Sequence, residues 1–279
     1  MNSTNLDQQK TDRQKNIEAL YAQTEPLSDA QKNIVETCIE DLDQGRLCVV
    51  EKGSEAWTVN EWVKKAILLY FRIRKIEKIE NGPFDYIDKI PVKRWTGTEG
   101  VRVVPHAIVR RGAYVESGAV LMPSYVNIGA RVGAGSMIDT WATVGSCGYV
   151  GKHVHVSGGV GIGGVLEPLQ AKPVIVEDNA FLGSRCILVE GVHVSKGAVL
   201  GAGVTITGST KIIDVSASQT QTYSGFVPEN SVVIPGTIDK TFPGGTYGVP
   251  CALIIGKRKP STDLKTSLND ALRTFDVSV

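Results

Sequence analysis

A six-residue repeat of apolar residues runs through the middle of the chain. Seventeen apolar residues fall on this grid in two runs, although hydrophobic residues make up only 42% of the sequence. Glycine or a small polar residue often follows the grid position, as at Gly133, Gly145 and Ser157. A hexapeptide repeat of this kind is typical of a parallel β-helix. The grid residues are Ile108, Tyr114, Val120, Val126, Val132, Ile138, Val144, Val150, Val156 and Ile162, then Val176, Leu182, Leu188, Val194, Leu200, Ile206 and Ile212.

Each hexapeptide is expected to supply one short strand and one turn, so that three of them close one triangular coil. The grid residue then points inward and stacks on its counterpart in the next coil, and small residues let the chain bend at the corners. A single hexapeptide cannot bury its apolar side, so stability requires several stacked coils. The repeat predicts between five and six coils. The period leaves the handedness open, and the general crossover rule favours a right-handed path.

Three zones are expected along the chain: a helical N-terminal domain with a hairpin in residues 1–98, the β-helix in 99–236, and a small mixed C-terminal domain in 237–279. In the first zone, Ser28 is a plausible N-cap for a helix that stops at Gly45, and Asn60 for a second, buried helix. Two strands are predicted around the turn at 52–54. Residues 75–98 are expected to be a connection, and the polar first 16 residues a frayed end.

Two breaks interrupt the repeat. Residues 163–173, with two prolines, are expected to leave the coil, and residues 213–225 to form a second excursion in the form of a hairpin. Binding loops in solenoids commonly occur at such breaks. The C-terminal zone is predicted to contain the apolar strand 251–256, a basic KRK segment and a helix built on Leu264, Leu268, Leu272 and Phe275, which caps the solenoid.

Composition limits the possible partners. The 279-residue chain has a formal net charge of +1, which gives no electrostatic basis for binding nucleic acid or an anionic membrane. The sequence has no apolar run of membrane-spanning length, and its polar first 16 residues are not expected to be a secretory signal. Its five cysteines are widely spaced and contain no CxxC pair, which indicates a reduced, cytoplasmic protein with buried thiols.

Several polar residues within the repeat are candidates for chemistry. Asp139 follows grid residue Ile138, where other hexapeptides carry glycine or serine, so it is either a general base or a turn aspartate. His153 and His155 suggest a metal pair, with His193 further along and His106 remote, but surface histidines are the commoner case. Residues 157–164 are rich in glycine and either bring backbone N–H groups close to a ligand or make tight corners. The candidate carboxylate clamps are Arg102, Arg110, Arg111, Arg131 and Arg185, each otherwise a surface charge.

The blocks MIDTWATVGSC and VHVSGGVGIGGVLEPLQAKP, together with WVKKAILLYFRI, GVRVVPHA and CALIIGKR, closely resemble the tetrahydrodipicolinate N-succinyltransferase family of hexapeptide acyltransferases. The resemblance covers the chain from about residue 28 onward. It implies a left-handed β-helix and a homotrimer with active sites between adjacent subunits. It also implies lysine and diaminopimelate biosynthesis, with succinyl-CoA as co-substrate, a small dicarboxylate acceptor, and neither a metal nor a tightly bound cofactor.

The resemblance also assigns roles to individual residues. Asp139 is the expected general base and binds the substrate together with Arg102, Ser157 and Arg185. The expected contacts with the coenzyme are made by Gly163, Lys257 and Arg258. One position departs from the family pattern, because Ile187 stands where many relatives have a glutamate and Glu190 is the nearest acid.

The implied reaction is direct acyl transfer. The acceptor adds water and opens, and its amine attacks the succinyl thioester while Asp139 accepts a proton. Three alternatives stay open: a hexapeptide acyltransferase with another acyl-CoA or acceptor, a zinc carbonic anhydrase of the γ type, and a non-enzymatic scaffold.

Overall fold

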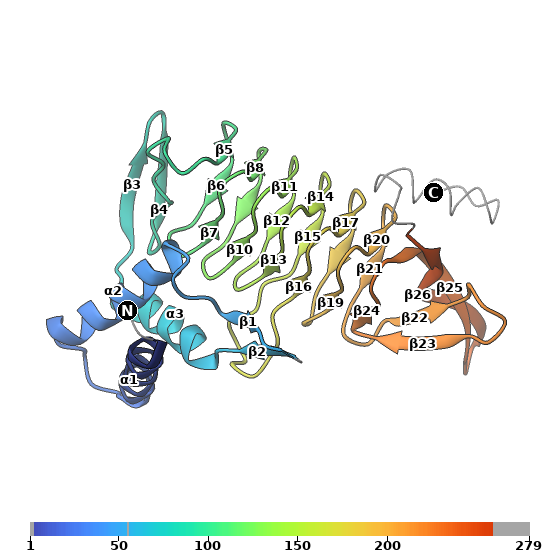
Figure 1. Cartoon of the computed structure of the whole chain (residues 1–279), viewed down its shortest axis with the longest axis horizontal. Helices are drawn as coiled ribbons and strands as arrows, with labels where there is room; N and C mark the ends of the chain where they lie inside the picture. The colour runs from blue at the N-terminus through green and yellow to red at the C-terminus, as the bar shows by residue number, and fades with distance from the viewer. Residues whose placement is uncertain (1–2, 55, 259–279) are drawn as a thin grey trace.

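The computed structural model describes residues 3–54 and 56–258, and it consists of a helical end, a prism of short parallel strands and a C-terminal hairpin region (Figure 1). Three sheets form the walls of the prism. Sheets 2 and 3 have six strands each, one for each coil. The predicted parallel β-helix is confirmed.

The strands of each wall are two residues long for most of the prism. Sheet 1 contains β5 (Arg102–Val103), β8 (Val120–Leu121), β11 (Met137–Ile138), β14 (His155–Val156), β17 (Phe181–Leu182) and β20 (Val199–Leu200). Sheet 2 contains β6 (Ile108–Val109), β9 (Tyr125–Val126), β12 (Thr143–Val144), β15 (Gly161–Ile162), β18 (Ile187–Leu188) and β21 (Thr205–Ile206). Sheet 3 contains β7 (Tyr114–Val115), β10 (Arg131–Val132), β13 (Tyr149–Val150), β16 (Ile175–Val176), β19 (His193–Val194) and β24 (Phe226–Val227).

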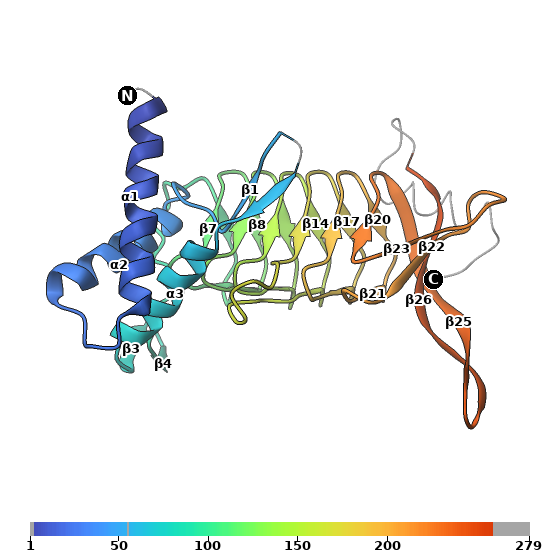
Figure 2. The same ribbon diagram turned by 90° about the horizontal axis from the view of Figure 1, so that it is seen from below.

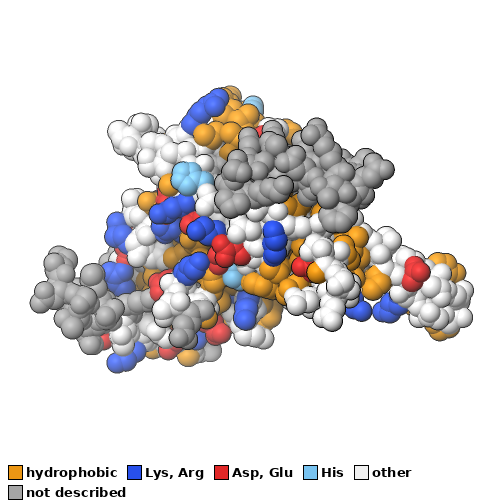
Figure 3. Space-filling model, turned by 45° about the vertical axis from the view of Figure 1, so that its right-hand side comes forward, with side chains coloured by type: hydrophobic (Ala, Val, Ile, Leu, Met, Phe, Trp, Pro, Cys, Tyr) orange, Lys and Arg blue, Asp and Glu red, His pale blue; other side chains and the backbone are white. Residues whose placement is uncertain are grey.

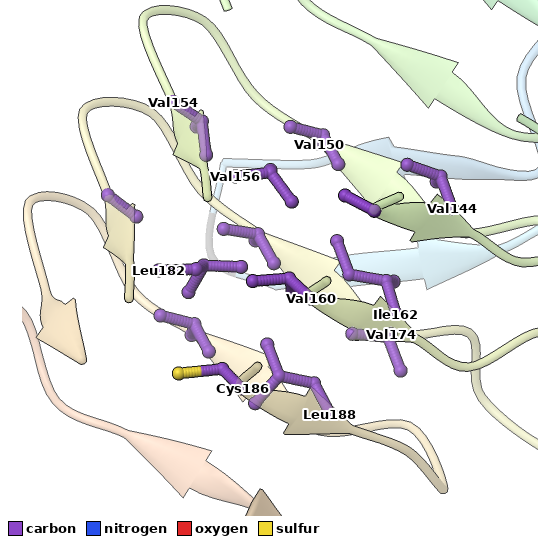
Figure 4. Close-up of a cluster of buried hydrophobic side chains, with 14 of the residues drawn as sticks. Val144, Val150, Val154, Val156, Val160, Ile162, Val174, Leu182, Cys186 and Leu188 are labelled. Carbon is purple, nitrogen blue, oxygen red and sulfur yellow. The ribbon is translucent and has the colours of Figure 1, made fainter. Parts of the chain in front are cut away.

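The second residue of each strand points inward and forms the core. Figure 4 shows Val144, Val150, Val156 and Ile162 converging between the walls, and all four are at most 2% exposed. The prediction for the first three grid residues is wrong, because Ile108, Tyr114 and Val120 pair with the outward residues of the next coil. Their neighbours Val109, Val115 and Leu121 are buried instead.

The shift in phase has a local cause. Val126 follows the inward Leu121 after five residues instead of six, so the corner at Met122–Ser124 is one residue short. Before this corner, the inward residue is the one directly after the grid position. From Val126 onward, the inward residues are those of the predicted grid.

Three helices form the N-terminal end: α1 (Ser3–Ala22), α2 (Asp29–Asp43) and α3 (Glu61–Ile73). Ser28 caps α2 through a capping box with Gln31, as its sequence predicts. Asn60 precedes α3 but caps it with no side-chain hydrogen bond, and its amide donates to Cys48 O instead. The expected frayed end is wrong from Ser3 onward, where α1 begins.

The predicted connection over residues 75–98 is also wrong in part. It contains the antiparallel hairpin of β3 (Glu77–Asn81) and β4 (Phe84–Asp88), which turns at Gly82 with a φ of 63°. The segment has no long apolar run, and the exposed Ile87 shows that little of this hairpin is covered. The signal in the sequence was the Asn-Gly turn alone.

A buried lysine fastens α3 to the first excursion from the coil. The chain leaves the prism between β15 and β16, within the predicted residues 163–173, and Val174 is back in the core. Lys64 is fully buried, and its Nζ donates to the carbonyl oxygens of Pro168, Leu169 and Ala171 at 3.2, 2.8 and 3.0 Å. All three ammonium hydrogens therefore have acceptors.

The predicted strands β1 (Val50–Lys52) and β2 (Trp57–Val59) form a hairpin that lies on the outer face of sheet 3. The Trp57 ring packs edge-on against Tyr149, and its Nε1 donates to Glu177 Oε1 at 2.8 Å. His193 Nε2 lies 3.0 Å from the same oxygen, and Lys52 Nζ lies 3.2 Å from Oε2. Glu177 therefore joins the N-terminal domain to the prism.

The C-terminal region begins with the predicted hairpin of β22 (Lys211–Asp214) and β23 (Gln221–Ser224). The long strands β25 (Ser231–Phe242) and β26 (Gly245–Lys257) then pair with each other, and β25 continues across residue 236 without a break. Their far end projects away from the prism (Figure 2). The predicted C-terminal helix lies outside the described residues.

The surface carries mixed charge. On the face shown in Figure 3, lysine and arginine side chains are interspersed with acidic ones. Within residues 3–54 and 56–258, no helix is long and apolar enough to span a membrane.

Replacing Lys64 by methionine is expected to lower the free energy of unfolding by about 2–5 kcal/mol, because three buried carbonyl groups lose a charged donor. Urea unfolding measures this change. The matched control is Lys65→Met, since Lys65 makes a long ion pair of 3.8 Å with Glu18 and lies 6.0 Å from the centroid of the Tyr21 ring, but binds no buried carbonyl group among the described residues. Equal stability of the two variants would contradict the role given to Lys64.

The contacts of Glu177 predict that the stability of the fold depends on pH. Burial alone would raise the pKa of Glu177, but hydrogen bonds from Trp57, His193 and Lys52 outweigh burial and hold this pKa below its ordinary value of 4.5. The ionised carboxylate therefore adds stability above pH 4.5, and this contribution is lost as the pH falls through the lowered pKa. We expect Glu177→Gln to be less stable than the wild type at pH 7 and the gap to close in acid, as followed by thermal unfolding. A gap that does not change with pH would contradict this assignment.

Candidate functional site

The corners between neighbouring walls form three edges along the prism: edge 1 between sheets 1 and 2, edge 2 between sheets 2 and 3, and edge 3 between sheets 3 and 1. At edge 1, each corner donates a backbone hydrogen bond to the coil before it. These bonds run from Trp141 N to Pro123 O (2.7 Å), Gly159 N to Thr140 O (2.9 Å) and Arg185 N to Gly158 O (3.0 Å). Trp141, Gly159 and Arg185 therefore occupy equivalent corners of three successive coils.

Asp139 lies at edge 1, directly after strand β11. Ile138 pairs with Val156, so Ser157 is the equivalent of Asp139 in the next coil, about 4.8 Å away. The Oδ1 atom of Asp139 accepts from Thr140 N at 2.6 Å and from Thr140 Oγ1 at 3.2 Å. Within the described residues, Oδ2 receives no hydrogen bond. One carboxylate oxygen is thus fixed while the other is available to a ligand.

Arg185 extends back along the edge. A Cβ atom added to Gly159 would lie 3.3 Å from Arg185 Cγ and 3.6 Å from both Cζ and Nη1. The guanidinium group therefore covers Gly159, which belongs to the same coil as Ser157. The coil of Asp139 is the next one along edge 1. The structure brings together three of the predicted site residues, Asp139, Ser157 and Arg185.

The five candidate arginines separate into two groups. Arg110 pairs with Asp88, Arg111 contacts Glu36, Glu40 and the Tyr70 hydroxyl, and Arg131 contacts Glu116. These three hold the structure together. Arg102 and Arg185 are exposed and make no ion pair with any described residue. Charged side chains of this kind are the ones available to a carboxylate ligand.

Arg102 lies at the start of sheet 1. It pairs with Val120, which pairs with Met137, so Arg102 is two coils, about 10 Å, from the coil of Asp139. It points outward from the wall and not along edge 1. Within one chain, Arg102 and Asp139 therefore occupy neighbouring but separate positions.

The residues expected to contact the coenzyme lie at other edges. Gly163 follows β15 at edge 2, where its N–H donates to Leu188 O at 2.8 Å. Lys257 and Arg258 reach edge 3, where Lys257 Nζ lies 2.9 Å from Ser231 Oγ and Arg258 Nη1 donates to Asn179 O at 3.1 Å. Each of these edges is one wall away from Asp139, and the roles of the three residues stay predictions.

The histidines lie on different parts of the fold. His153 is at edge 3 with a φ of 53°, while His155 is on the outer face of sheet 1 and stacks on Phe181. His193 binds Glu177 on sheet 3, and His106 packs against Phe84. In the part of the chain that the structure describes, no three His, Cys, Asp or Glu residues are grouped to hold a metal ion. The arrangement gives no support to a zinc carbonic anhydrase.

Glu190 is not a substitute for a second carboxylate beside Asp139. It lies at edge 2, across sheet 2 from Asp139, and its Oε2 accepts from Gly208 N at 3.1 Å. Ile187, at the position of the family glutamate, is on the outer face of sheet 2 and 37% exposed. Among the described residues, Asp139 is therefore the acid at edge 1.

The thiols are packing groups. Cys147 and Cys186 are buried, and burial raises the pKa of each thiol to about 12. The Sγ atom of Cys186 contacts Gly201 O at 3.1 Å. A thiolate nucleophile requires a lowered pKa, so neither residue fits that role.

Trp141 is a residue of edge 1 that the sequence did not single out. Its side chain is 73% exposed and its φ is 60°. It lies two residues after Asp139, and the equivalent corner of the next coil has Gly159. The available signal was the 18-residue spacing between Trp141 and Gly159, which is the length of one coil.

The chain is similar to known proteins along most of its length. Residues 12–73 match the family model described as tetrahydrodipicolinate N-succinyltransferase N-terminal, and residues 173–208 match hexapeptide repeat of succinyl-transferase. Three relatives are named 2,3,4,5-tetrahydropyridine-2,6-dicarboxylate N-succinyltransferase. They come from Methylorubrum populi (48% identity, covering 92% of this chain and 97% of the relative), Idiomarina loihiensis (46%, covering 98% and 99%) and Acinetobacter baylyi (50%, covering 87% and 89%).

The thiol assignment leads to a prediction. At pH 8, iodoacetamide should modify Cys147 and Cys186 of the native protein far more slowly than a free thiol, because both are buried with a pKa of about 12. Peptide mass spectrometry measures the rate at each site. The half-buried Cys48 is an internal comparison, and the urea-unfolded protein is the positive control. Rapid labelling of either residue in the folded protein would show that it is an accessible, activated thiol.

Proposed function

The chain belongs to the 2,3,4,5-tetrahydropyridine-2,6-dicarboxylate N-succinyltransferase family, and from this premise we propose that edge 1 is where the reaction takes place, with succinyl-CoA as the donor. The protein is an acyltransferase that transfers a succinyl group to a nitrogen of its acceptor in lysine and diaminopimelate biosynthesis. The acceptor is tetrahydrodipicolinate in its hydrated, opened form, 2-amino-6-oxopimelate.

The proposed chemistry is direct transfer. The acceptor amine attacks the thioester carbonyl of succinyl-CoA, an N–C bond forms, and the C–S bond breaks. Asp139 accepts the proton that the nitrogen loses and passes it to the departing sulfur, so that CoA leaves as the thiol and the carboxylate is restored. The products are N-succinyl-2-amino-6-oxopimelate and CoA. No step requires a metal ion or an acyl-enzyme.

One observation carries the proposal. Asp139 Oδ1 is fixed by Thr140, while Oδ2 receives no hydrogen bond from the described residues. A base held in this way has a defined orientation and one oxygen for the substrate proton. Ser157 and the unpaired Arg185 lie beside it and supply groups for a carboxylate.

The proposed assembly is a homotrimer with its active sites between adjacent subunits, in the cytoplasm. Arg102 is the reason for placing the site between subunits, because it points outward from sheet 1, two coils from the coil of Asp139, and not along edge 1. Arg102 of one subunit would meet the substrate beside Asp139 of the next. Lys257 and Arg258 would meet the phosphates of the donor, and Gly163 its pantetheine chain.

Another acyl donor is the principal alternative. A competition assay of succinyl-CoA against acetyl-CoA, with the acceptor held constant, separates the two. Faster transfer from acetyl-CoA would overturn the choice of donor and leave the edge-1 site unaffected.

Asp139→Asn is expected to lower kcat by about 10²–10⁴-fold, because the amide cannot accept the proton, while succinyl-CoA binding by calorimetry stays nearly unchanged. The matched control is Asp214→Asn, since Asp214 also accepts from a nearby backbone N–H but lies in the β22–β23 hairpin. Wild-type turnover in the Asp139 variant would remove this residue from the mechanism.

A further inference from the structure

Trp141 places a large, exposed aromatic side chain on a corner of edge 1. Its indole is 73% exposed, and its backbone has the left-handed φ of 60°. The same corner of edge 1 is filled by Gly159 and Gly203 in two later coils, with φ values of 69° and 73°, and by Arg185 with a φ of 60°. Glycine adopts this conformation without strain, whereas a large side chain does not. The two large side chains that edge 1 carries at this corner beside Asp139 are therefore Trp141 and Arg185.

The other three tryptophans have structural partners. Trp62 is buried, Trp57 packs on Tyr149, and Trp95 lies under Lys93 Nζ, with 5.8 Å between the ammonium and the ring centroid. Among the described residues, Trp141 makes no ring contact. Its apolar surface is therefore free in this chain for a ligand or another subunit.

Arg185 supplies a charged counterpart on the same edge. Trp141, Gly159 and Arg185 occupy successive coils about 4.8 Å apart. The Arg185 guanidinium folds back over Gly159, which leaves the space open because it has no Cβ atom. The guanidinium group therefore approaches the coil of Trp141, with the free oxygen of Asp139 two residues away along the chain.

We propose that Trp141 and Arg185 together recognise a carboxylate carried on a short aliphatic chain, and that Trp141 determines specificity for this ligand. The guanidinium fork pairs with the carboxylate, and the indole face packs against the methylene groups next to it. This inference rests on the proposed function, in which the succinyl group and the acceptor both have this chemistry. The two sources are distinguished by experiment.

The first experiment measures ligand binding without turnover. Tryptophan fluorescence of the intact protein is quenched with acrylamide in the absence and presence of pimelate, a plain seven-carbon dicarboxylate, and separately of succinyl-CoA. We expect an accessible tryptophan in the wild type that one of these ligands protects, and no such protection in Trp141→Phe. If Trp141 is already shielded without ligand, or neither ligand protects it, the recognition role is overturned.

The second experiment uses Trp141→Gly. Glycine fits the corner, so this variant should unfold at the same temperature as the wild type or a higher one. We expect the KM of one substrate to rise about tenfold or more with little change in kcat, which identifies the ligand that Trp141 contacts. Trp141→Phe should restore most of the affinity, and Arg185→Gln should raise the KM of the same substrate.

The matched control is Tyr247→Ala, because Tyr247 is also exposed, at 59%, but lies near the tip of the β25–β26 hairpin. If Trp141→Gly leaves both KM values within about twofold of the wild type, the proposal fails. A wild type without succinyl transfer would instead reject the proposed function, and the quenching result with pimelate would still decide the role of Trp141.

Discussion

The inward stacking of one apolar side chain per hexapeptide is the constraint on which the rest of the structure depends. Residues such as Val144, Val156 and Leu188 are completely buried between three walls, although each wall contributes strands of only two residues. No strand this short is stable alone, so the coils are stable only as a stack. Because each inward residue fixes the phase of its coil, it also fixes which residues reach the corners. The core therefore determines the position of every residue at edge 1.

Much of this architecture could be predicted from the sequence, because the period of the apolar residues reports the core directly. The same signal failed at the first coil, where a corner with one residue fewer moved the interior from Ile108 to Val109. Where two apolar residues follow each other, as at Ile108 and Val109, either one could be the inward residue of the strand. Only the pairing of the strands shows which of the two is inward. The β3–β4 hairpin was missed for a different reason, because its strands are largely exposed and have no apolar pattern.

The candidate site was predicted in part. Asp139 stood out because it is a carboxylate in a position that otherwise holds small residues. The grouping into edges needed the length of each coil: 18 residues separate Asp139 from Ser157, but 26 separate Gly159 from Arg185 because the excursion between β15 and β16 intervenes. Once the extra residues of the excursion are subtracted, Arg185 lies at the same edge as Asp139. The residues that lie at other edges are Glu190, Gly163, Lys257 and Arg258. Trp141 was missed because an aromatic residue in a β-rich segment suggests packing, and its exposure follows only from its place at a corner.

A prism of this kind holds the side chains at its edges in fixed positions before any ligand binds. The side chains of edge 1 project from corners whose backbone hydrogen bonds continue from coil to coil, so they do not depend on a loop that must become ordered when a ligand binds. The excursion between β15 and β16 leaves this register intact, since its extra residues project from the prism and are held there by Lys64. The fold thus separates two tasks. The repeat holds Asp139, Trp141 and Arg185 in a row with fixed spacing, and the interruptions add structure on the other edges without moving that row.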